Sequence, residues 1–183
     1  MSNPMQIQDS EIMARASKIK LLLLDVDGVM SDGKIYFSST GSEIKSFNTL
    51  DGHGIKMLRR SGVEVGIITG RTSEIVARRA KDLGIHLLKQ GREDKFDALR
   101  ELQEDFPCAY EDIAYVGDDY PDLTVMIRAG LSISVANAHP EVAKRSHWQT
   151  TKKGGDGAVR EVCDMIMLAQ GTFDSALEVY LSD

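Results

Sequence analysis

The sequence predicts an α/β fold, a doubly wound parallel sheet with helices on both of its faces. Short apolar runs of strand type alternate along the chain with amphipathic stretches of helical period, which is typical of repeated βα units. In addition, Gly62, Gly84 and Gly130 fall where the helical stretches end, at positions that favour a helix C-cap. These observations predict one parallel sheet.

The individual strands and helices are predicted from continuous apolar runs and from apolar residues at helical spacing. Apolar and β-branched residues run together in the segments expected to form strands, residues 20–25, 63–69, 87–90, 113–117 and 131–136. Apolar residues recur at helical spacing in the segments expected to form helices, residues 11–17, 54–60, 73–83, 95–106, 121–129, 140–146 and 158–169. After residue 63, strands and helices alternate, as parallel strands require.

One segment, residues 34–48, departs from this alternation. The apolar residues 35–37, the turn sequence Ser-Ser-Thr-Gly at residues 38–41 and the segment 43–47 together predict a β-hairpin flap. The core strands and helices use up the rest of the chain between residues 25 and 118, so no cap domain is expected. We therefore predict a single domain over residues 1–183, with the hairpin at residues 34–48 as the insertion that could cover a site.

Composition narrows the classes of function. The 183 residues are 42% hydrophobic and 27% charged, which is ordinary for a globular domain. The net charge of −6 argues against a nucleic-acid partner, so an anionic substrate must be met by local cations or a metal ion. No apolar run is long enough for a membrane span, no secretory leader is recognised, and Cys108 and Cys163 fit reduced thiols. We expect a cytoplasmic protein without a membrane partner.

Four short segments carry the chemical signal. They are Asp-Val-Asp-Gly at 25–28, Thr-Gly-Arg at 69–71, Lys95, and Gly-Asp-Asp at 117–119 followed by Asp122. The first, second and last of these directly follow expected strands. Because the carboxyl ends of parallel strands meet at one edge of the sheet, the sequence predicts a site there for Mg²⁺ and a phosphoryl group.

Each residue type has a chemical reason to be in such a site. Asp25 can act as the nucleophile that forms an aspartyl phosphate. Asp27 can protonate the leaving oxygen and later deprotonate a water molecule. The hydroxyl and backbone N–H of Thr69 can donate to phosphoryl oxygens, and Lys95 adds a positive charge. The expected catalytic residues are therefore Asp25, Asp27, Thr69 and Lys95.

The same segments predict a metal site. Mg²⁺ prefers oxygen ligands, and the carboxylates of Asp25 and Asp118 with the backbone carbonyl of Asp27 could supply them. Asp119 and Asp122 are expected to position Lys95 and metal-bound water molecules instead of binding the ion directly.

Other classes of protein use some of the same residue types. A calcium-binding loop starting at Asp25 fails, because its glycine falls at the fourth position and Tyr36 occupies the twelfth, where a bidentate Glu is required. The histidines have no metal-ligand spacing. A response-regulator receiver also uses Asp, Thr and Lys, but its phosphoacceptor follows the third strand, whereas Asp25 follows the first. That alternative, and a non-catalytic regulatory domain, stay open at this point.

In combination, the four segments resemble the four signature motifs of the haloacid dehalogenase (HAD) superfamily of phosphohydrolases. That resemblance implies a HAD-like, Rossmannoid domain with a β-hairpin flap and no cap domain. Longer segments more narrowly resemble the 3-deoxy-D-manno-octulosonate (Kdo) 8-phosphate phosphatases. They are residues 24–29, 47–48 with 51–52, 67–71, 114–119, 135–136 with 138–140, and 154–155 with 157–161. That resemblance implies a Mg²⁺-dependent phosphomonoesterase of lipopolysaccharide biosynthesis, with a sugar-acid phosphate as substrate, and a homotetramer. A phosphatase of nonulosonate 9-phosphates is the alternative within this group.

The resemblance also implies substrate contacts. They would be made by Asp27, Asn48, Thr49, Leu50, Asp51, Gly52, Lys56, Arg71, Arg79 and Lys95. The chain departs from the family at Leu50, where members often carry Arg, so a cation is missing from this set.

Overall fold

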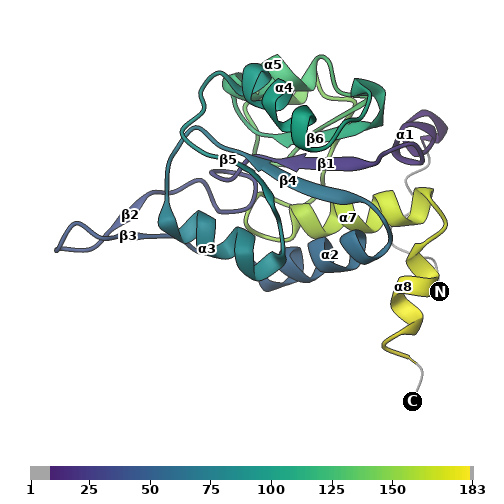
Figure 1. The fold of residues 1–183 in the computed structure, drawn as a ribbon, viewed down its shortest axis with the longest axis horizontal. Helices are drawn as coiled ribbons and strands as arrows, with labels where there is room; N and C mark the ends of the chain where they lie inside the picture. Colours follow the sequence, from purple (N-terminus) through teal and green to yellow (C-terminus); the bar gives the residue numbers. More distant parts are fainter. Residues whose placement is uncertain (1–8, 182–183) are drawn as a thin grey trace.

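A six-stranded parallel sheet forms the centre of the computed structural model, which describes residues 9–181 (Figure 1). The strands are β1 (Leu21–Leu24), β4 (Glu64–Ile68), β5 (Leu87–Lys89), β6 (Ile113–Gly117), β7 (Leu131–Ser134) and β8 (Trp148–Gln149). Their order across the sheet is β5-β4-β1-β6-β7-β8. The chain therefore runs outward from β1 in one direction, then returns to its other side at β6. The predicted doubly wound parallel sheet is confirmed.

The central strand shows why the apolar run is continuous. All four leucines of β1 are buried. Leu22 and Leu24 point into one hydrophobic core, and Leu21 and Leu23 point into the other. Successive side chains of a strand face opposite sides, so a strand covered on both faces must be apolar throughout.

Helices form a layer on each side of this sheet (Figure 1). One layer contains α1 (Ser10–Ala16), α2 (Thr49–Arg60), α3 (Glu74–Leu83) and α7 (Ala158–Ala169). The other contains α4 (Lys95–Asp105), α5 (Tyr120–Met126) and α6 (Pro140–Ala143). The longest, α2 and α7, have 12 residues each, and no helix within residues 9–181 has the length and apolarity to cross a bilayer.

Helix α2 begins earlier than its sequence pattern suggests. It was expected over residues 54–60, but it starts at Thr49, and the side chain of Asn48 caps it by accepting from the Leu50 N–H. Two glycines weaken the helical signal there. A Cβ on Gly54 would lie 2.7 Å from Cδ of Arg160, so the missing side chain lets α2 pack closely against α7. Tertiary packing outweighs local propensity.

The hairpin predicted over residues 34–48 is present but short. Its strands are β2 (Tyr36–Phe37) and β3 (Glu43–Ile44), paired antiparallel, and it projects from the body of the molecule (Figure 1). Ile35, Phe37 and Ile44 are exposed. Phe47, in contrast, packs against the core.

Several details were not predicted. The edge strand β8, the helix α8 (Phe173–Glu178) and the short 3-10 helix η1 (Tyr110–Asp112) have too few residues for a clear periodicity. The expected C-cap at Gly130 is wrong, since α5 ends at Met126. A Cβ at Gly130 would lie 2.1 Å from the carbonyl oxygen of Glu111, so a close backbone approach requires this glycine.

Candidate active site

The acidic motifs meet at the carboxyl ends of β1 and β6. These two strands are adjacent, and their register continues beyond β1 because the Asp25 N–H donates to the Val116 carbonyl at 3.1 Å. Asp118 directly follows β6. The chain adds β4 and β5 on one side of β1, and β6, β7 and β8 on the other, so the strand order reverses between β1 and β6. Ligands of such sheets bind outside the carboxyl ends of the strands at this point.

The turn after β1 brings its backbone against Asp118. Gly28 has a φ of 98°, in the left-handed region that favours glycine. A Cβ at this position would lie 2.1 Å from Oδ2 of Asp118. The glycine of the Asp-Val-Asp-Gly segment is therefore required both by the turn and by the approach of the second acidic motif.

Lys95 connects the first and last motifs. Its Nζ lies 2.9 Å from Oδ1 of Asp25 and 2.6 Å from Oδ1 of Asp122. Lys95 is the first residue of α4, and its side chain is only 4% exposed. An ammonium this deeply buried requires anionic partners, and both are present.

Asp122 uses both of its carboxylate oxygens within the protein. Oδ1 accepts from Lys95 and from the hydroxyl of Tyr115 at 2.7 Å, and Oδ2 accepts from the N–H groups of Asp118 and Asp119 at 3.0 and 3.1 Å. Asp119 is the N-cap of α5. Asp122 therefore fixes the position of Lys95 and of the loop that carries Asp118.

The electrostatics of this cluster are unfavourable for free carboxylates. Burial and the charge of Asp122 raise the pKa of Asp25 to about 7, although Lys95 opposes the shift. Burial, Asp122 and Asp25 raise the pKa of Asp118 to about 8. Burial would lower the pKa of Lys95, but Asp25 and Asp122 more than offset it, so the pKa is raised. Additional positive charge would reduce the repulsion among these carboxylates.

The residues present fit a divalent cation. Asp25, Asp118 and Asp122 each offer an oxygen, and these oxygens lie within 4.8 Å of one another. Hard oxygen ligands suit Mg²⁺, and a cation between Asp25 and Asp118 would remove the repulsion that raises their pKa values. Because Asp122 is already saturated with donors, Asp25 and Asp118 are the side chains available to hold the ion.

Thr69 lies one residue beyond β4, which pairs with β1. Its side chain is buried. The expectation that its backbone N–H serves a phosphoryl group is wrong, because that N–H donates to the Lys89 carbonyl at 3.0 Å and extends the sheet. The hydroxyl is the donor that Thr69 can offer.

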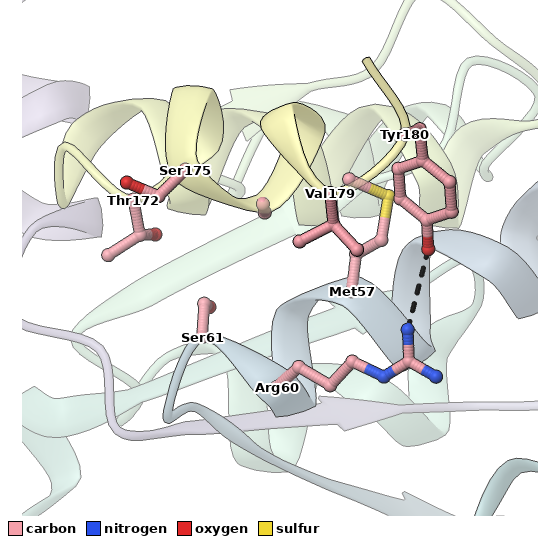
Figure 2. A pocket seen from close by; sticks show the side chains of 8 residues that line it. Met57, Arg60, Ser61, Thr172, Ser175, Val179 and Tyr180 are labelled. Atoms are coloured by element: carbon pink, nitrogen blue, oxygen red, sulfur yellow. Dashed lines mark hydrogen bonds between the residues drawn. The ribbon is translucent and has the colours of Figure 1, made fainter. Parts of the chain in front are cut away.

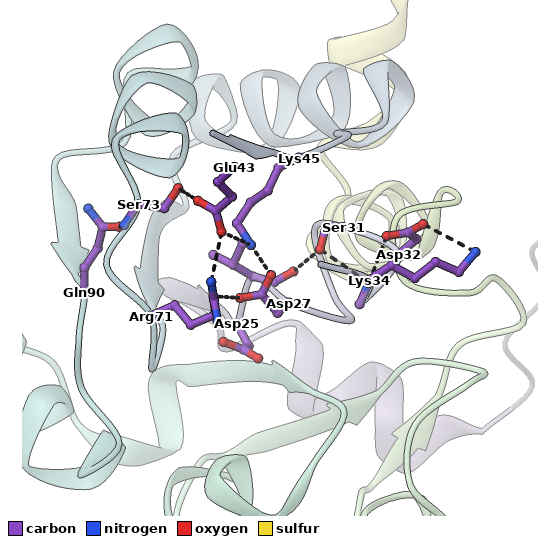
Figure 3. A network of polar contacts seen from close by, with 12 residues as sticks. Asp25, Asp27, Ser31, Asp32, Lys34, Glu43, Lys45, Arg71, Ser73 and Gln90 are labelled. Carbon is purple, nitrogen blue, oxygen red and sulfur yellow. Dashed lines mark hydrogen bonds and ion pairs between the residues drawn. The ribbon is translucent and has the colours of Figure 1, made fainter. Parts of the chain in front are cut away.

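Asp27 lies in a second polar network, shown in Figure 3. The ammonium of Lys45 contacts its Oδ1, and Nε of Arg71 lies 3.9 Å from its Oδ2. Glu43 of the hairpin contacts both cations, at 3.5 Å from Lys45 and 3.2 Å from Arg71. Each oxygen of Asp27 therefore faces a different cation.

Most of the remaining predicted substrate residues gather near the start of α2. Thr49, Gly52, Lys56 and Arg79 line a pocket of 190 Å³ together with His53 and Leu83. Nη2 of Arg79 donates to the Asn48 carbonyl at 3.2 Å. Leu50 is exposed. None of the three clustered carboxylates, Asp25, Asp118 and Asp122, lines this pocket.

Asp51 is buried, unlike Thr49 and Leu50 before it. Its Oδ1 accepts from the Arg160 N–H at 2.8 Å, at the start of α7. Burial raises its pKa, although this hydrogen bond opposes the shift. Asp51 therefore ties α2 to α7.

A larger cavity, of 290 Å³, lies at the other end of α2 (Figure 2). It is lined by Met57, Arg60, Ser61, Thr172, Ser175, Ala176, Val179 and Tyr180. Its lining contains no carboxylate, and its one cation, Arg60, donates to the Tyr180 hydroxyl at 3.4 Å. This cavity therefore contains neither a carboxylate nucleophile nor carboxylate ligands for a metal ion.

Sequence reasoning missed Glu43, Lys45, Ser73 and Tyr115. Glu43 and Lys45 alternate with the exposed Ile44, so their spacing already placed both on one face of the predicted hairpin. Tyr115 was a polar group in an otherwise aliphatic strand two residues before Gly117. Ser73 carried no separate signal, because a serine at the start of a helix is most often an N-cap, whereas here its hydroxyl donates to Glu43.

Comparison with known proteins agrees with this geometry. A sequence profile of the haloacid dehalogenase-like hydrolases matches residues 85–162. The 3-deoxy-D-manno-octulosonate 8-phosphate phosphatase of Yersinia pestis is 49% identical over 166 residues, which are 91% of this chain and 89% of that protein.

Two crystal structures are also similar. A probable phosphatase from Pseudomonas syringae has a TM-score of 0.94 and 52% identity, covering 96% of this chain and 99% of that one. The 3-deoxy-D-manno-octulosonate 8-phosphate phosphatase of Moraxella catarrhalis, solved with a magnesium ion, a phosphate ion and Kdo, has a TM-score of 0.91 and 46% identity, covering 93% and 98%. The chain therefore belongs to the haloacid dehalogenase-like hydrolases, in the phosphatase family that includes the 3-deoxy-D-manno-octulosonate 8-phosphate phosphatases.

Proposed function

We propose that this protein hydrolyses Kdo 8-phosphate to Kdo and phosphate, in lipopolysaccharide biosynthesis. The observation that carries the proposal is the joining of Asp25, Lys95, Asp122 and Asp118 at the ends of β1 and β6, in a chain about half identical to phosphatases of that specificity. Because the family consists of phosphatases, the receiver-like and non-catalytic interpretations are not supported.

The first chemical step uses Asp25 and Asp27. An oxygen of Asp25 attacks phosphorus, the bond from phosphorus to the sugar oxygen breaks, and a proton from Asp27 neutralises the leaving alkoxide. Lys95 contacts Asp25 at 2.9 Å, which favours the ionised carboxylate needed for attack. The Thr69 hydroxyl donates to a phosphoryl oxygen.

The second step returns the enzyme to its starting state. Asp27 removes a proton from a water molecule, whose oxygen attacks phosphorus, and the bond from phosphorus to Asp25 breaks to release phosphate. The same group thus serves as acid and then as base, so the protons balance over one turnover.

Asp25 and Asp118, with the backbone carbonyl of Asp27, would hold Mg²⁺. When bound, the ion supplies positive charge that offsets repulsion between the anionic substrate and the carboxylates. Asp122 contributes indirectly, because it fixes the backbone of Asp118 and the ammonium of Lys95.

Recognition of a sugar acid requires cations in addition to Lys95. Arg71 lies beside Asp27, within reach of a ligand at the phosphoryl site, and its side chain is 43% exposed. Lys56 and Arg79 line the separate pocket at the start of α2. We propose that Arg71 serves the site of its own chain, and that Lys56 and Arg79 complete the site of a neighbouring subunit.

A homotetramer would bring these pieces together. The hairpin exposes Ile35, Phe37 and Ile44, which is more apolar surface than an isolated two-stranded ribbon favours in water. Packing of hairpins from several subunits would bury this surface and place a neighbour next to each site. A cytoplasmic location is part of the same proposal.

The deciding experiment is phosphate release from a panel of sugar phosphates by the purified protein, with Mg²⁺ or with excess chelator. The panel includes Kdo 8-phosphate, a nonulosonate 9-phosphate, ribose 5-phosphate and 4-nitrophenyl phosphate. We expect the highest kcat/KM for Kdo 8-phosphate, and only with Mg²⁺. Preference for the nonulosonate 9-phosphate would identify the alternative substrate, and equal turnover in chelator would contradict the role of the metal.

A further inference from the structure

Glu43 is the centre of the hairpin's polar contacts (Figure 3). Its Oε1 lies 3.5 Å from Nζ of Lys45 and 3.2 Å from Nη2 of Arg71, and its Oε2 accepts from the hydroxyl of Ser73 at 2.6 Å. Lys45 and Arg71 in turn lie against the two oxygens of Asp27. One carboxylate therefore holds both cations that flank the acid–base residue.

Burial within the hairpin is one-sided. The Lys45 side chain is 1% exposed and that of Glu43 is 19% exposed, while the Ile44 between them is 54% exposed. A lysine is rarely so buried unless it is paired. Residues 43 and 45, on the inner side of the hairpin, therefore make polar contacts with the site.

Two cations serve the two carboxyl groups of this network. Lys45 and Arg71 each contact both Glu43 and Asp27, and the Ser73 hydroxyl donates to the remaining oxygen of Glu43. The Ser73 hydrogen bond, together with Lys45 and Arg71, holds the pKa of Glu43 below its ordinary value, so Glu43 is ionised. Without Glu43, the two cations would lose the anion that aligns them with each other.

We propose that Glu43 is a positioning residue for the reaction: it holds Lys45 and Arg71 on the two oxygens of Asp27, and so couples docking of the hairpin to the orientation of the acid–base group. The proposal rests on the function proposed above. It predicts that Glu43 acts through Asp27, although it contacts neither the phosphoryl site nor Asp27 directly.

A double-mutant cycle tests this role. Wild type, Glu43→Gln, Asp27→Asn and the double variant are compared by kcat/KM on 4-nitrophenyl phosphate and on whichever sugar phosphate of the panel is hydrolysed fastest. A sugar alkoxide needs a proton as it leaves, whereas 4-nitrophenolate leaves without one. The matched control is Asp32→Asn, which removes an acidic group that binds Lys34 and Tyr36 at the base of the hairpin.

We expect Glu43→Gln to lower kcat/KM for the sugar phosphate by about tenfold or more, with the full 10² to 10⁴ of general acid–base help as the upper limit. The loss for the aryl phosphate should be far smaller. In the Asp27→Asn background, Glu43→Gln should have no further effect. Ser73→Ala, which removes only the contact to Oε2, should act in the same direction more weakly. Asp32→Asn should leave kcat/KM unchanged for both substrates.

Two results would overturn the inference without touching the phosphatase mechanism: equal losses on both substrates, or a Glu43→Gln loss that is as large in the Asp27→Asn background as in the wild type. Both would indicate a structural role of the hairpin. If Asp27→Asn itself left sugar-phosphate hydrolysis unchanged, the acid–base assignment and the role of Glu43 would fall together.

Discussion

Nζ of Lys95 lies 2.9 Å from Oδ1 of Asp25, although 95 and 25 are far apart in the sequence and both side chains are buried. Burial and Asp122 raise the pKa of Asp25 to about 7, and Lys95 opposes this shift. The contact therefore favours the ionised form of the one carboxylate placed to attack phosphorus.

Substitution of the two aspartates should separate their roles. Asp25→Asn should abolish turnover, because an amide is neither a nucleophile nor an anionic metal ligand. Asp27→Asn should retain a slow reaction, reduced by about 10² to 10⁴, the range of general acid–base help. Steady-state phosphate release measures both. Near-normal turnover by Asp25→Asn would rule out the covalent mechanism.

Metal binding should depend on Asp118 and fold stability on Asp122. Asp118→Ala should weaken Mg²⁺ binding, measured by calorimetry, because it removes one of two available carboxylates. Asp122→Ala should chiefly lower the thermal midpoint, because it leaves Lys95, Tyr115 and two backbone N–H groups without their acceptor. Equal Mg²⁺ affinities of the Asp118→Ala variant and the wild type would contradict the ligand set.

Metal-free protein should lose stability as the pH rises. The pKa values of Asp25 and Asp118 are raised to about 7 and about 8, so the folded state binds protons that the unfolded state releases near pH 4. The stabilisation is fully present below about pH 4 and disappears as the pH rises through about 7 and 8.

Thermal unfolding in chelator at about pH 5.5 and about pH 8.5 checks this sign. The midpoint of the wild type should fall between these values by more than that of Asp118→Asn, which lacks one of the repelling charges. Mg²⁺ should raise the midpoint more at the higher pH. A wild-type midpoint that falls no more than that of the variant would contradict the repulsion.

Arg71 should affect substrate choice. A guanidinium can bind a carboxylate through two parallel hydrogen bonds, which an ammonium cannot. Arg71→Lys should therefore lower kcat/KM for Kdo 8-phosphate while sparing 4-nitrophenyl phosphate, which has no carboxylate. Lys34→Arg, an exchange of the same two residue types at an exposed position in the hairpin, serves as the control. Equal losses on both substrates would place Arg71 at the phosphate or in the scaffold.

The exposed face of the hairpin should determine assembly. Ile35→Asp combined with Phe37→Asp should yield species smaller than a tetramer in analytical ultracentrifugation, with reduced activity and an unchanged circular dichroism spectrum. Both side chains are exposed and outside the two cores, so the fold should tolerate the charges. A wild type that sediments as a fully active monomer would refute a site shared between subunits.

The sequence alone determined the order of most elements, apart from β8, α8 and η1, and it identified the site residues Asp25, Lys95, Asp118 and Asp122. A strand buried on both faces must be apolar throughout, as β1 is, and polar groups that follow such strands collect at one edge of the sheet. Asp25, Asp118 and Lys95 could therefore be assigned to one site before their distances were known. Helix ends were less certain, because Gly52 and Gly54 hide the first turns of α2.

Only the tertiary structure decided which charges face each other. The sequence showed Asp27 and a hairpin, but not that Lys45 and Glu43 turn back onto Asp27, Arg71 and Ser73. From the sequence, the backbone N–H of Thr69 was expected to donate to a ligand. In the structure, it donates to the carbonyl of Lys89 and extends the sheet. These contacts join residues that are distant in the sequence, at separations that follow no regular pattern. Local periodicity therefore carries no information about them. They depend on how the hairpin and the strands pack against each other.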